Sequence, residues 1–163
     1  EIPGRCFFRI FKKMIIRKAY LKDIPALVSL FLEYDRVEHK LNPTVPMGSR
    51  KKYVAFFKKN LPKPRFAVFV ADDGKLRGLI HAEIFGFPDN KFLFGSVQNV
   101  IVSHAYRNKG IGTKLFKTAV VWLKKHPIRR ISVYVHGKNK KALTFWKHKK
   151  FKIRGYQLEL PIK

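Results

Sequence analysis

A β-rich run that turns within a few residues into a glycine-containing helix is the feature that most restricts the fold of this chain. The run covers residues 97–103, and Arg107-Asn108-Lys109-Gly110-Ile111-Gly112 follows it at the start of a helical pattern. One face of that pattern is apolar, as expected of an amphipathic helix packed on a sheet. It is formed by Ile111, Leu115, Ala119, Trp122 and Leu123. The segment therefore predicts a strand, a turn and a buried helix over residues 110–125.

The rest of the chain predicts further strands and helices around this segment. Asp23, Ser49 and Asn139 are expected to cap three more helices. Strands are expected over residues 14–19, 66–71, 76–87, 92–103 and 131–136, with closing strands over 151–160. We predict an α+β domain over residues 14–163, with a mixed, predominantly antiparallel sheet flanked by helices, after an N-terminal extension of residues 1–13.

The turn over residues 107–112 has the chemistry of an anion site. Gly110 and Gly112 let the backbone approach a ligand closely, and the first N–H groups of a helix have no partner inside it. The helix dipole adds roughly half a positive charge at this end, and Arg107 and Lys109 add full charges. The turn therefore predicts a phosphate site, although a glycine-rich helix entry can also be purely structural.

The stretch from Gln98 to Leu115 resembles the acetyl-CoA signature of the GNAT superfamily of N-acetyltransferases. A second element, Asn139-x-x-Ala142-x-x-Phe145-Trp146, stands at the distance downstream that this family uses. Residues 14–34 resemble the family's opening strand and acceptor-side helix, so the resemblance covers about residues 14–160. It implies a GNAT-like acyl-CoA N-acyltransferase fold, and transfer of an acetyl group from acetyl-CoA to a primary amine by direct attack in a ternary complex.

The resemblance also implies which residues bind the cofactor. Backbone groups of Val100, Ile101 and Val102 are expected to pair with the pantetheine arm like an added strand, and the N–H near Val102 is expected to stabilise the oxyanion of the tetrahedral intermediate. Asn139 is expected either to bind the pantetheine or to cap its own helix. Trp146 is expected beside the cofactor or in the core. The pyrophosphate is expected on the turn formed by Arg107, Asn108, Lys109, Gly110, Ile111, Gly112 and Thr113.

The catalytic base of the family is altered in this chain. Many members have a glutamate on the fourth strand where this chain has Gln98, which cannot take a proton but can position a water or the acceptor. Glu83 and His81 lie two residues apart on the preceding strand, so their side chains point to the same face of the sheet, and they are the nearest substitutes. We select Glu83 as the candidate base; the simpler interpretation is a strand carboxylate that faces solvent or pairs with a lysine.

The general acid and the turn after it are altered as well. Many members reprotonate the leaving thiolate with a tyrosine, and Trp146 replaces it here. An indole N–H donates a hydrogen bond but does not deliver a proton near neutral pH. Tyr134 is our candidate substitute, with His148, Tyr156 or solvent as alternatives. The glycine that the family has before Phe151 is replaced by a lysine, which affects the turn more than the chemistry.

The charge of the chain bears on its partners. Thirty-six Lys and Arg against ten Asp and Glu give a formal charge of +26, and such a field attracts polyanions and repels polycations. It argues against polyamines and aminoglycosides as acceptors. The charges are dispersed, so they serve either solubility or an anionic partner such as RNA, a ribosomal protein or a DNA-associated protein. Glu33, Asp35 and Glu38 end the first helix, and they either hold an ammonium substrate or are solvated.

Other classes of protein are disfavoured. No apolar run approaches the roughly 20 residues of a membrane helix, and the N-terminus lacks a signal-peptide pattern. Cys6 is the single cysteine, so we expect a cytoplasmic protein without an internal disulfide. The histidines are scattered without metal-ligand spacing, so no metal is expected. The sequence does not indicate an oligomeric state.

Two functions remain for the sequence. The first is an active N-acetyltransferase for an unidentified amine. The second is a GNAT-like module that binds CoA or nucleic acid with little or no catalytic activity. The replaced glutamate and tyrosine favour the module, whereas the complete phosphate turn favours the enzyme, which we predict.

Overall fold

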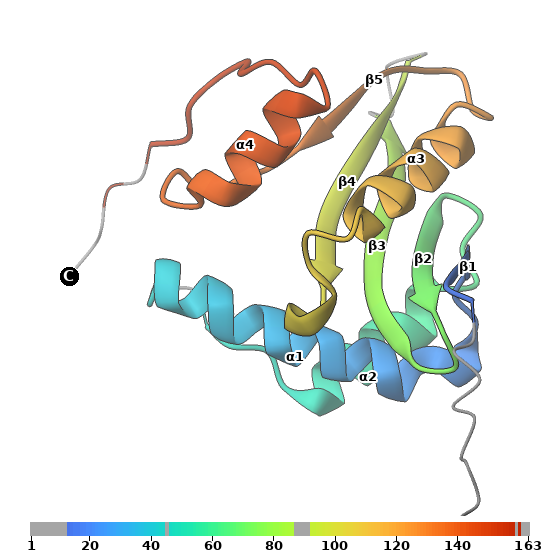
Figure 1. Ribbon diagram of the computed structural model, residues 1–163. Coiled ribbons are helices and arrows are strands. Elements are labelled where there is room, and N and C mark those ends of the chain that lie inside the picture. Colours follow the sequence, from blue (N-terminus) through green and yellow to red (C-terminus); the bar gives the residue numbers. More distant parts are fainter. Residues whose placement is uncertain (1–12, 45, 87–91, 159, 161–163) are drawn as a thin grey trace, which may run out of the picture.

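The computed structural model describes residues 13–44, 46–86, 92–158 and 160, and Figure 1 shows the arrangement of its elements. Apart from Lys13, the predicted N-terminal extension lies outside the described residues. The elements are β1 (Ile15–Lys18), η1 (Leu21–Asp23), α1 (Ile24–Leu41), α2 (Arg50–Asn60), β2 (Phe66–Asp72), β3 (Leu76–Gly86), β4 (Leu93–Val102), η2 (His104–Tyr106), α3 (Ile111–Leu123), β5 (Ile128–Val133) and α4 (Lys140–His148).

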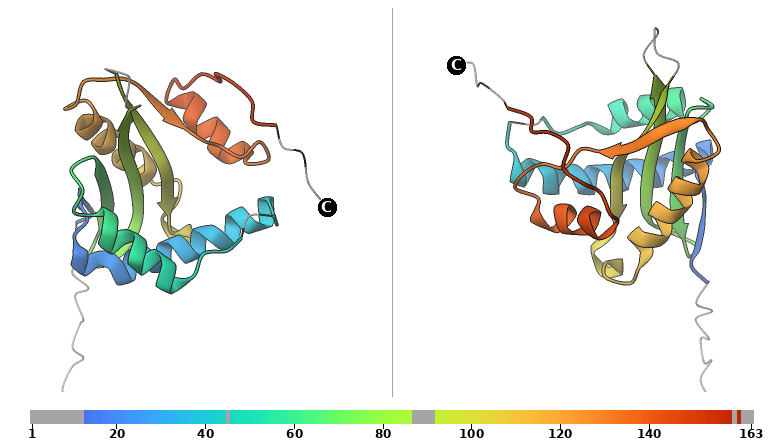
Figure 2. Two further views of the ribbon diagram at one scale, coloured as in Figure 1. Left: turned by 180° about the vertical axis from the view of Figure 1, so that it is seen from behind. Right: turned by 90° about the horizontal axis from the view of Figure 1, so that it is seen from above.

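The strands form one sheet in the order β1-β2-β3-β4-β5. The first four strands pair antiparallel, and β5 joins β4 in parallel. The helices α1 and α2 lie on one face of the sheet and α3 lies on the other, as the view from above in Figure 2 shows. The predicted α+β class and the mixed, predominantly antiparallel sheet are therefore confirmed.

The sheet separates two apolar cores. Alternate residues of β3 point to opposite faces, so Leu79 packs under α1 and α2 whereas Ile80 packs under α3. The predicted apolar face of α3 is confirmed, with Leu115 and Leu123 fully buried. Because both faces of the central strands are buried, a slip of one residue would exchange the two cores, and the register is strongly specified.

Two of the three predicted helix caps are confirmed by a side-chain hydrogen bond. The Ser49 hydroxyl accepts from the Lys52 N–H at 3.3 Å, and the Asn139 side-chain oxygen accepts from the Ala142 N–H at 3.0 Å. Asp23 is the N-cap residue of α1, as predicted, but its side chain makes no capping bond to that helix.

The Asp23 carboxylate is used elsewhere. It accepts two hydrogen bonds from Arg17 on β1, at 2.7 and 2.9 Å. Arg17 also donates to Asp72 of β2 at 2.9 Å, and these hydrogen bonds hold the pKa of the Asp23 carboxyl below its usual range. A charge-assisted, bidentate bond is stronger than a neutral cap, so this trio joins the first two strands to the start of α1.

Two strand predictions need correction. The strand expected at residues 131–136 begins at Ile128, directly after Pro127, because Ile128 pairs with the first residue of β4. The closing strands expected over 151–160 are absent from residues 151–158 and 160, which the structure describes. The described part of this segment has the alternating pattern of a strand but pairs with no other strand, and its Tyr156 and Leu158 are 87% and 91% exposed. After α4 the chain runs away from the sheet (Figure 1).

The end of α4 explains that direction. The Phe151 N–H donates to the Trp146 carbonyl at 3.1 Å, and the Lys150 N–H donates to the Lys147 carbonyl at 2.9 Å. The rings of Phe151 and Trp146 lie 5.1 Å apart. These contacts form a Schellman motif, whose left-handed position usually carries glycine. Lys150 occupies it with φ 67°.

We predict that Lys150→Gly stabilises the protein by about 1 kcal/mol, because glycine adopts the left-handed conformation without the steric cost of a Cβ. Urea denaturation followed by circular dichroism measures the change. Lys149→Gly is the matched control: Lys149 has φ −85°, so glycine there relieves nothing and should destabilise. Equal effects of the two substitutions would contradict the assignment.

Candidate active site

The sheet opens between β4 and β5. The two strands pair from Leu93 to Val97, and the last pair joins Val97 to Val133; beyond it they diverge (Figure 1). At the same point β4 carries one extra residue, because Asn99 pairs with His81 while Val97 pairs with Ala82. Gln98 is therefore a β-bulge, which bends the strand at the start of the opening.

Backbone groups of β4 face the opening. The Ser103 N–H donates to the Arg77 carbonyl at 2.8 Å, and hydrogen-bonded pairs alternate along an antiparallel ladder. Ile101 lies two residues before Ser103, so its N–H and C=O also point toward β3. Val100 and Val102 therefore direct theirs toward the opening, where a ligand can pair with them as an added strand.

The turn before α3 presents N–H groups. Asn108 and Gly110 have φ of 59° and 74°, and no side chain caps the helix at Gly110. Alternation of left-handed and extended or helical residues makes a concave anion site from successive N–H groups. The N–H groups of residues 111–113 precede the first helical bond, which Lys114 makes to the Gly110 carbonyl at 3.0 Å. We call residues 107–113 the phosphate cradle.

Side chains that the sequence reasoning missed hold the phosphate cradle in place. The Tyr106 ring lies between two cations, with the Arg77 guanidinium at 4.6 Å and the Lys109 ammonium at 5.3 Å from its centroid. Asp73 accepts from Arg77 at 2.8 Å. Arg107 donates from its Nε to the Val102 carbonyl at 2.9 Å. These contacts could not be predicted from the sequence, because a tyrosine in a turn and an arginine near the start of an earlier strand occur together in many unrelated chains.

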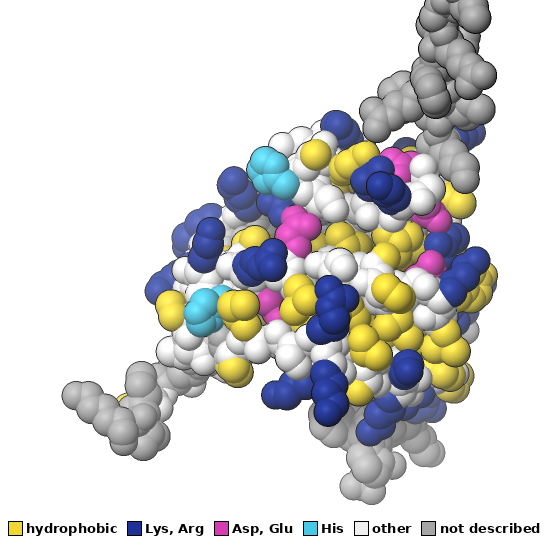
Figure 3. Space-filling view, turned by 90° about the horizontal axis from the view of Figure 1, so that it is seen from below, with side chains coloured by type: hydrophobic (Ala, Val, Ile, Leu, Met, Phe, Trp, Pro, Cys, Tyr) yellow, Lys and Arg dark blue, Asp and Glu magenta, His cyan; other side chains and the backbone are white. Residues whose placement is uncertain are grey.

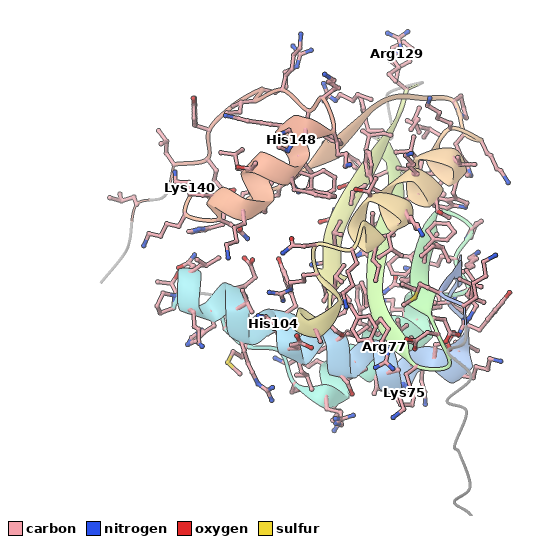
Figure 4. The ribbon with its side chains drawn as sticks, viewed as in Figure 1. Lys75, Arg77, His104, Arg129, Lys140 and His148 are labelled. Atoms are coloured by element: carbon pink, nitrogen blue, oxygen red, sulfur yellow. The ribbon has the colours of Figure 1, made fainter. Side chains whose placement is uncertain are left out.

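A basic pocket of about 600 Å³ lies between the phosphate cradle and α4. Figure 4 shows His104 on the η2 side of this opening and Lys140 across it, on the first turn of α4. The pocket is concave and has cations on both walls, which suits a ligand with several phosphates. It is lined by His104, Arg107, Asn108, Lys140, Lys141 and Thr144.

Three predicted cofactor residues have structural contacts. Asn139 caps α4, as described, and donates from its amide nitrogen to Glu38 of α1 at 3.4 Å. Trp146 is 6% exposed and packs against Phe116 of α3. The Thr113 hydroxyl accepts from Lys149 at 2.8 Å. Asn139 and Trp146 therefore hold α4 in position, whatever contact they make with a cofactor.

The predicted catalytic side chains are distributed around the bulge. Gln98 donates to the Ser96 hydroxyl at 2.8 Å. Glu83 pairs across the strands with Ser96, and its side chain is 45% exposed. Tyr134 follows β5 and is 63% exposed. The structure thus brings Glu83 and Gln98 together, and Tyr134 comes from the opposite side of the opening.

His81 is buried without a full set of partners. Its side chain is 5% exposed, and its Nε2 makes no hydrogen bond to any described residue. The nearest charge is the Glu83 carboxylate, 3.9 Å from Nε2, and the Phe66 ring lies 4.4 Å away. Burial lowers the pKa of His81 to about 4, against a hydrogen bond to Asn99 that favours the charged form. The imidazole is therefore neutral at physiological pH.

The acidic cluster predicted at the end of the first helix is divided. Asp35 accepts from the Tyr53 hydroxyl at 2.6 Å and from the Gly48 N–H at 2.8 Å, so it links α1 to α2. Glu38 accepts from the Asn139 amide nitrogen at 3.4 Å. Of the three carboxylates, Glu38 is the one that contacts the start of α4.

The described surface carries positive charge without a single tract on the face shown in Figure 3, where lysine and arginine side chains alternate with acidic and apolar ones. Among the described residues, no three His, Cys, Asp or Glu side chains gather as a metal site requires. Within the same residues, no helix has the length and hydropathy needed to cross a membrane.

The acetyltransferase (GNAT) family model matches residues 27–151. The chain therefore belongs to the GNAT acetyltransferase family, and it is an acyltransferase. No curated protein matches it in sequence.

Solved structures share its fold at low identity. A transcriptional regulator from Bacillus halodurans is 21% identical over 92% of this chain and 100% of that chain, with a TM-score of 0.75. Aminoglycoside N-acetyltransferase AAC(6')-Iy in complex with CoA is 16% identical over 93% and 95%, with a TM-score of 0.72. Glucosamine-6-phosphate N-acetyltransferase from Arabidopsis thaliana is 16% identical over 93% and 99%, with a TM-score of 0.70.

The buried histidine gives a prediction about stability. Its pKa rises from about 4 in the folded state to about 6.5 when unfolded, so the unfolded chain binds the extra proton between these values. The free energy of unfolding should be level above about pH 6.5 and fall by on the order of 3 kcal/mol as the pH drops toward 4.

Urea denaturation at intervals from pH 7 to pH 4 measures this dependence. His81→Leu should flatten it, and His148→Gln, at an exposed position, should leave it unchanged. An unaltered slope in His81→Leu would show that other groups cause the dependence.

Proposed function

We propose that this protein transfers an acetyl group from acetyl-CoA to a primary amine, by direct attack of the amine in a ternary complex. The observation that carries the proposal is the edge of β4 that β5 leaves uncovered after Val97, which leads from the bulge at Gln98 to the phosphate cradle. A cofactor with an extended amide arm and a pyrophosphate matches both parts. The family membership favours this enzyme over a module that only binds CoA or nucleic acid.

The pantetheine arm is proposed to pair with Val100 and Val102. The original prediction also included Ile101, but the ladder directs its backbone groups to β3. The pyrophosphate is proposed to bind the N–H groups of residues 108–113. Gly112 supports this fit, because a Cβ built there would lie 3.6 Å from Phe145, in ordinary contact, so the protein itself has room for a side chain.

The first turn of α4 is proposed to form a second wall for the phosphates. Lys140 and Lys141 face the pocket opposite Arg107. Together with the helix N–H groups they surround an anion from two sides, and their charges add to the field of the α3 dipole. This wall was not among the predicted cofactor residues, because consecutive lysines on a helix usually belong to a solvated surface.

In the proposed reaction, a backbone N–H of β4 polarises the thioester carbonyl and stabilises the oxyanion. Val102 was predicted for this role. The N–H of Val100, two residues earlier on β4, points in the same direction and is the alternative donor. Gln98 is proposed to orient the acceptor or a water. Tyr134 stays a prediction as the group that protonates the thiolate, as does Glu83 as the base.

The acceptor is proposed to be an amine that carries, or is attached to, negative charge. Two similar structures are an aminoglycoside and a glucosamine-6-phosphate acetyltransferase, and the +26 charge favours the anionic kind of acceptor over a polycation. RNA-bound, ribosomal or DNA-associated amines satisfy the same condition. A screen of acetyl-CoA consumption against amino-sugar phosphates, acidic peptides, RNA–protein assemblies and aminoglycosides tests this, and preference for aminoglycosides would contradict it.

Gly112→Ala should weaken acetyl-CoA binding by more than about tenfold, or roughly 1.4 kcal/mol, because the methyl group occupies the surface that the pyrophosphate approaches. Isothermal titration calorimetry measures the affinity, and the melting temperature with and without acetyl-CoA gives a second measure. Gly155→Ala, in open space, is the control. Unchanged binding in Gly112→Ala would place the phosphates elsewhere.

The double substitution Lys140→Gln, Lys141→Gln should weaken CoA binding about fivefold and make it less sensitive to salt, because exposed ion pairs contribute up to about 1 kcal/mol each and are screened. Titrations at low and high salt measure both effects. Lys147→Gln with Lys152→Gln removes the same charge outside the pocket. An equal loss in this control would mean that only net charge matters.

A further inference from the structure

The sheet face that packs against α1 and α2 is covered over only part of its length. Leu79 of β3 and Ile101 of β4 belong to the core beneath the two helices. Alternate residues of a strand share a face, so Glu83 and Phe85 lie on the same side as Leu79. They are not part of that core: the Glu83 side chain is 45% exposed and Phe85 is 40% exposed. The far end of β3 and β4 therefore has an accessible face.

Arginine and phenylalanine side chains gather at this accessible end. Phe85 pairs across the strands with Phe94 of β4, and their rings lie 5.9 Å apart. The Arg130 guanidinium lies 4.6 Å from the centroid of the Phe94 ring. The Arg129 guanidinium lies 3.2 Å from the centroid of the Phe92 ring, just before β4. We call these five residues the arginine–phenylalanine strip.

A β-bulge in β5 brings the two arginines together. Between two successive pairs of the β4–β5 ladder, β4 has one residue, Phe94, whereas β5 has two, Arg129 and Arg130. A bulge of this kind places both residues of the longer strand opposite one partner. The flanking Ile128 and Ile131 pack on the core under α3, which leaves the arginines outside that core. Figure 4 shows Arg129 at the outer end of the sheet.

The arginines are open to a ligand. Both are exposed, and neither makes a hydrogen bond or an ion pair with a side chain in the described part of the chain. A guanidinium offers a planar face for stacking and N–H donors that match a phosphate. The Phe85 and Phe92 rings, 40% and 37% exposed, add apolar surface beside these donors.

The mixture of cations and rings distinguishes nucleic acid from other polyanions. An acidic peptide pairs with the arginines but has no planar groups to place on phenylalanine. A nucleic acid supplies both a phosphate for each guanidinium and a base for each ring or guanidinium plane. The formal charge of +26 favours the same partner over long range.

The spacing of the strip favours a single strand. Residues two apart on a strand, such as Phe92 and Phe94, are about 6.8 Å apart, whereas the bases of a duplex follow each other at about 3.4 Å. Bases stacked on one another therefore cannot each cover a separate member of the strip. Separated bases of a single strand can, as they do on the aromatic side chains of sheets in RNA-recognition domains.

The strip leads toward the opening between β4 and β5. Phe94 and Gln98 are four residues apart on β4, or about 13 Å. Between them Ser96 pairs with Glu83 on one side and with Ser132 on the other. The Glu83 carboxylate repels phosphate and attracts an ammonium group. A strand on the strip therefore keeps its phosphates at the outer end of the sheet and directs an attached amine to the bulge.

We propose that the arginine–phenylalanine strip binds single-stranded nucleic acid, and that the bound strand presents the acceptor amine to the opening. Bases stack on the ring and guanidinium planes, and phosphates accept from Arg129 and Arg130. The presentation of the amine rests on the proposed acetyl transfer, whereas the binding does not depend on it.

Fluorescence anisotropy with a labelled oligouridine, at several salt concentrations, measures this binding. Arg129→Gln with Arg130→Gln should weaken it at least tenfold and reduce the slope of log affinity against log salt by about 1.4, because each phosphate contact of a single strand contributes about 0.7. Phe85→Leu and Phe92→Leu should each weaken it about fivefold with the slope unchanged, because they remove stacking and no charge. Phe92→Leu alone decides if Phe85→Leu is unstable.

Matched controls separate the strip from net charge and from exposed rings in general. Lys51→Gln with Lys52→Gln removes two charges from exposed positions on α2, and Tyr156→Leu removes a ring that is 87% exposed. Both variants should bind nearly as the wild type does. Equal losses in the lysine pair would overturn the inference. So would equal affinity for a duplex of the same length or for oligoglutamate of the same charge.

A second measurement distinguishes this inference from the proposed function. Acetyl-CoA should raise the melting temperature equally in the wild type and in the strip variants. Transfer to an oligouridine that carries an aminoalkyl group should fall about tenfold in kcat/KM in the arginine variant, with transfer to glucosamine 6-phosphate unchanged. No oligouridine binding, with acetyl-CoA stabilisation intact, overturns the strip alone. Binding that depends on the strip, without transfer to any amine, supports the strip and contradicts the proposed function.

Discussion

The divergence of β4 and β5 after Val97 is the constraint on which the rest of the site depends. A strand within a sheet must satisfy its backbone groups, and beyond this pair no strand covers the open side of β4, where Arg107 donates to the Val102 carbonyl. The helices that follow the two strands are consequently held apart: α3 begins where β4 leads into the phosphate cradle, and α4 begins after β5. One break in a ladder thus creates the free edge, the pocket and both of its walls.

Several acidic residues make internal contacts, so they compensate little of the positive charge on the surface. Asp23 and Asp72 bind Arg17, Asp73 binds Arg77, and Asp35 joins α1 to α2. These carboxylates are committed to internal contacts, so they neutralise few of the surface lysines. The excess positive charge therefore creates an electrostatic field that acts on molecules around the protein.

The sequence predicts the parts of this structure that depend on local pattern. The periodicity of α3 and the caps at Ser49 and Asn139 are set by neighbouring residues, and they were predicted correctly. Asp23 is the N-cap residue of α1, but the sequence pattern did not predict that Arg17 of β1 would bind its carboxylate in place of the helix N–H groups. The closing strands failed because alternation cannot specify whether a partner edge is available.

In the candidate site, too, the sequence predicts the contiguous motifs but not the contacts between distant residues. The phosphate cradle is a contiguous motif, so its turn and helix start follow from the sequence, and its role in binding phosphates stays a prediction. The contact between Glu38 of α1 and Asn139 at the start of α4 joins residues 101 positions apart, and no sequence pattern distinguishes it from two solvated polar side chains. The bulge at Gln98 also escaped prediction, because an extra residue is visible only from the register of both strands.

The two cores described above give the enzyme a modular response to mutation. Residues beneath α1 and α2 and residues beneath α3 are separated by the sheet, and distant substitutions without shared partners have additive effects. The acceptor side can therefore diverge while cofactor affinity is retained. The exception is Asn139, whose amide caps α4 and also donates to Glu38 of α1, so selection for a new acceptor should meet its strongest epistasis at this asparagine.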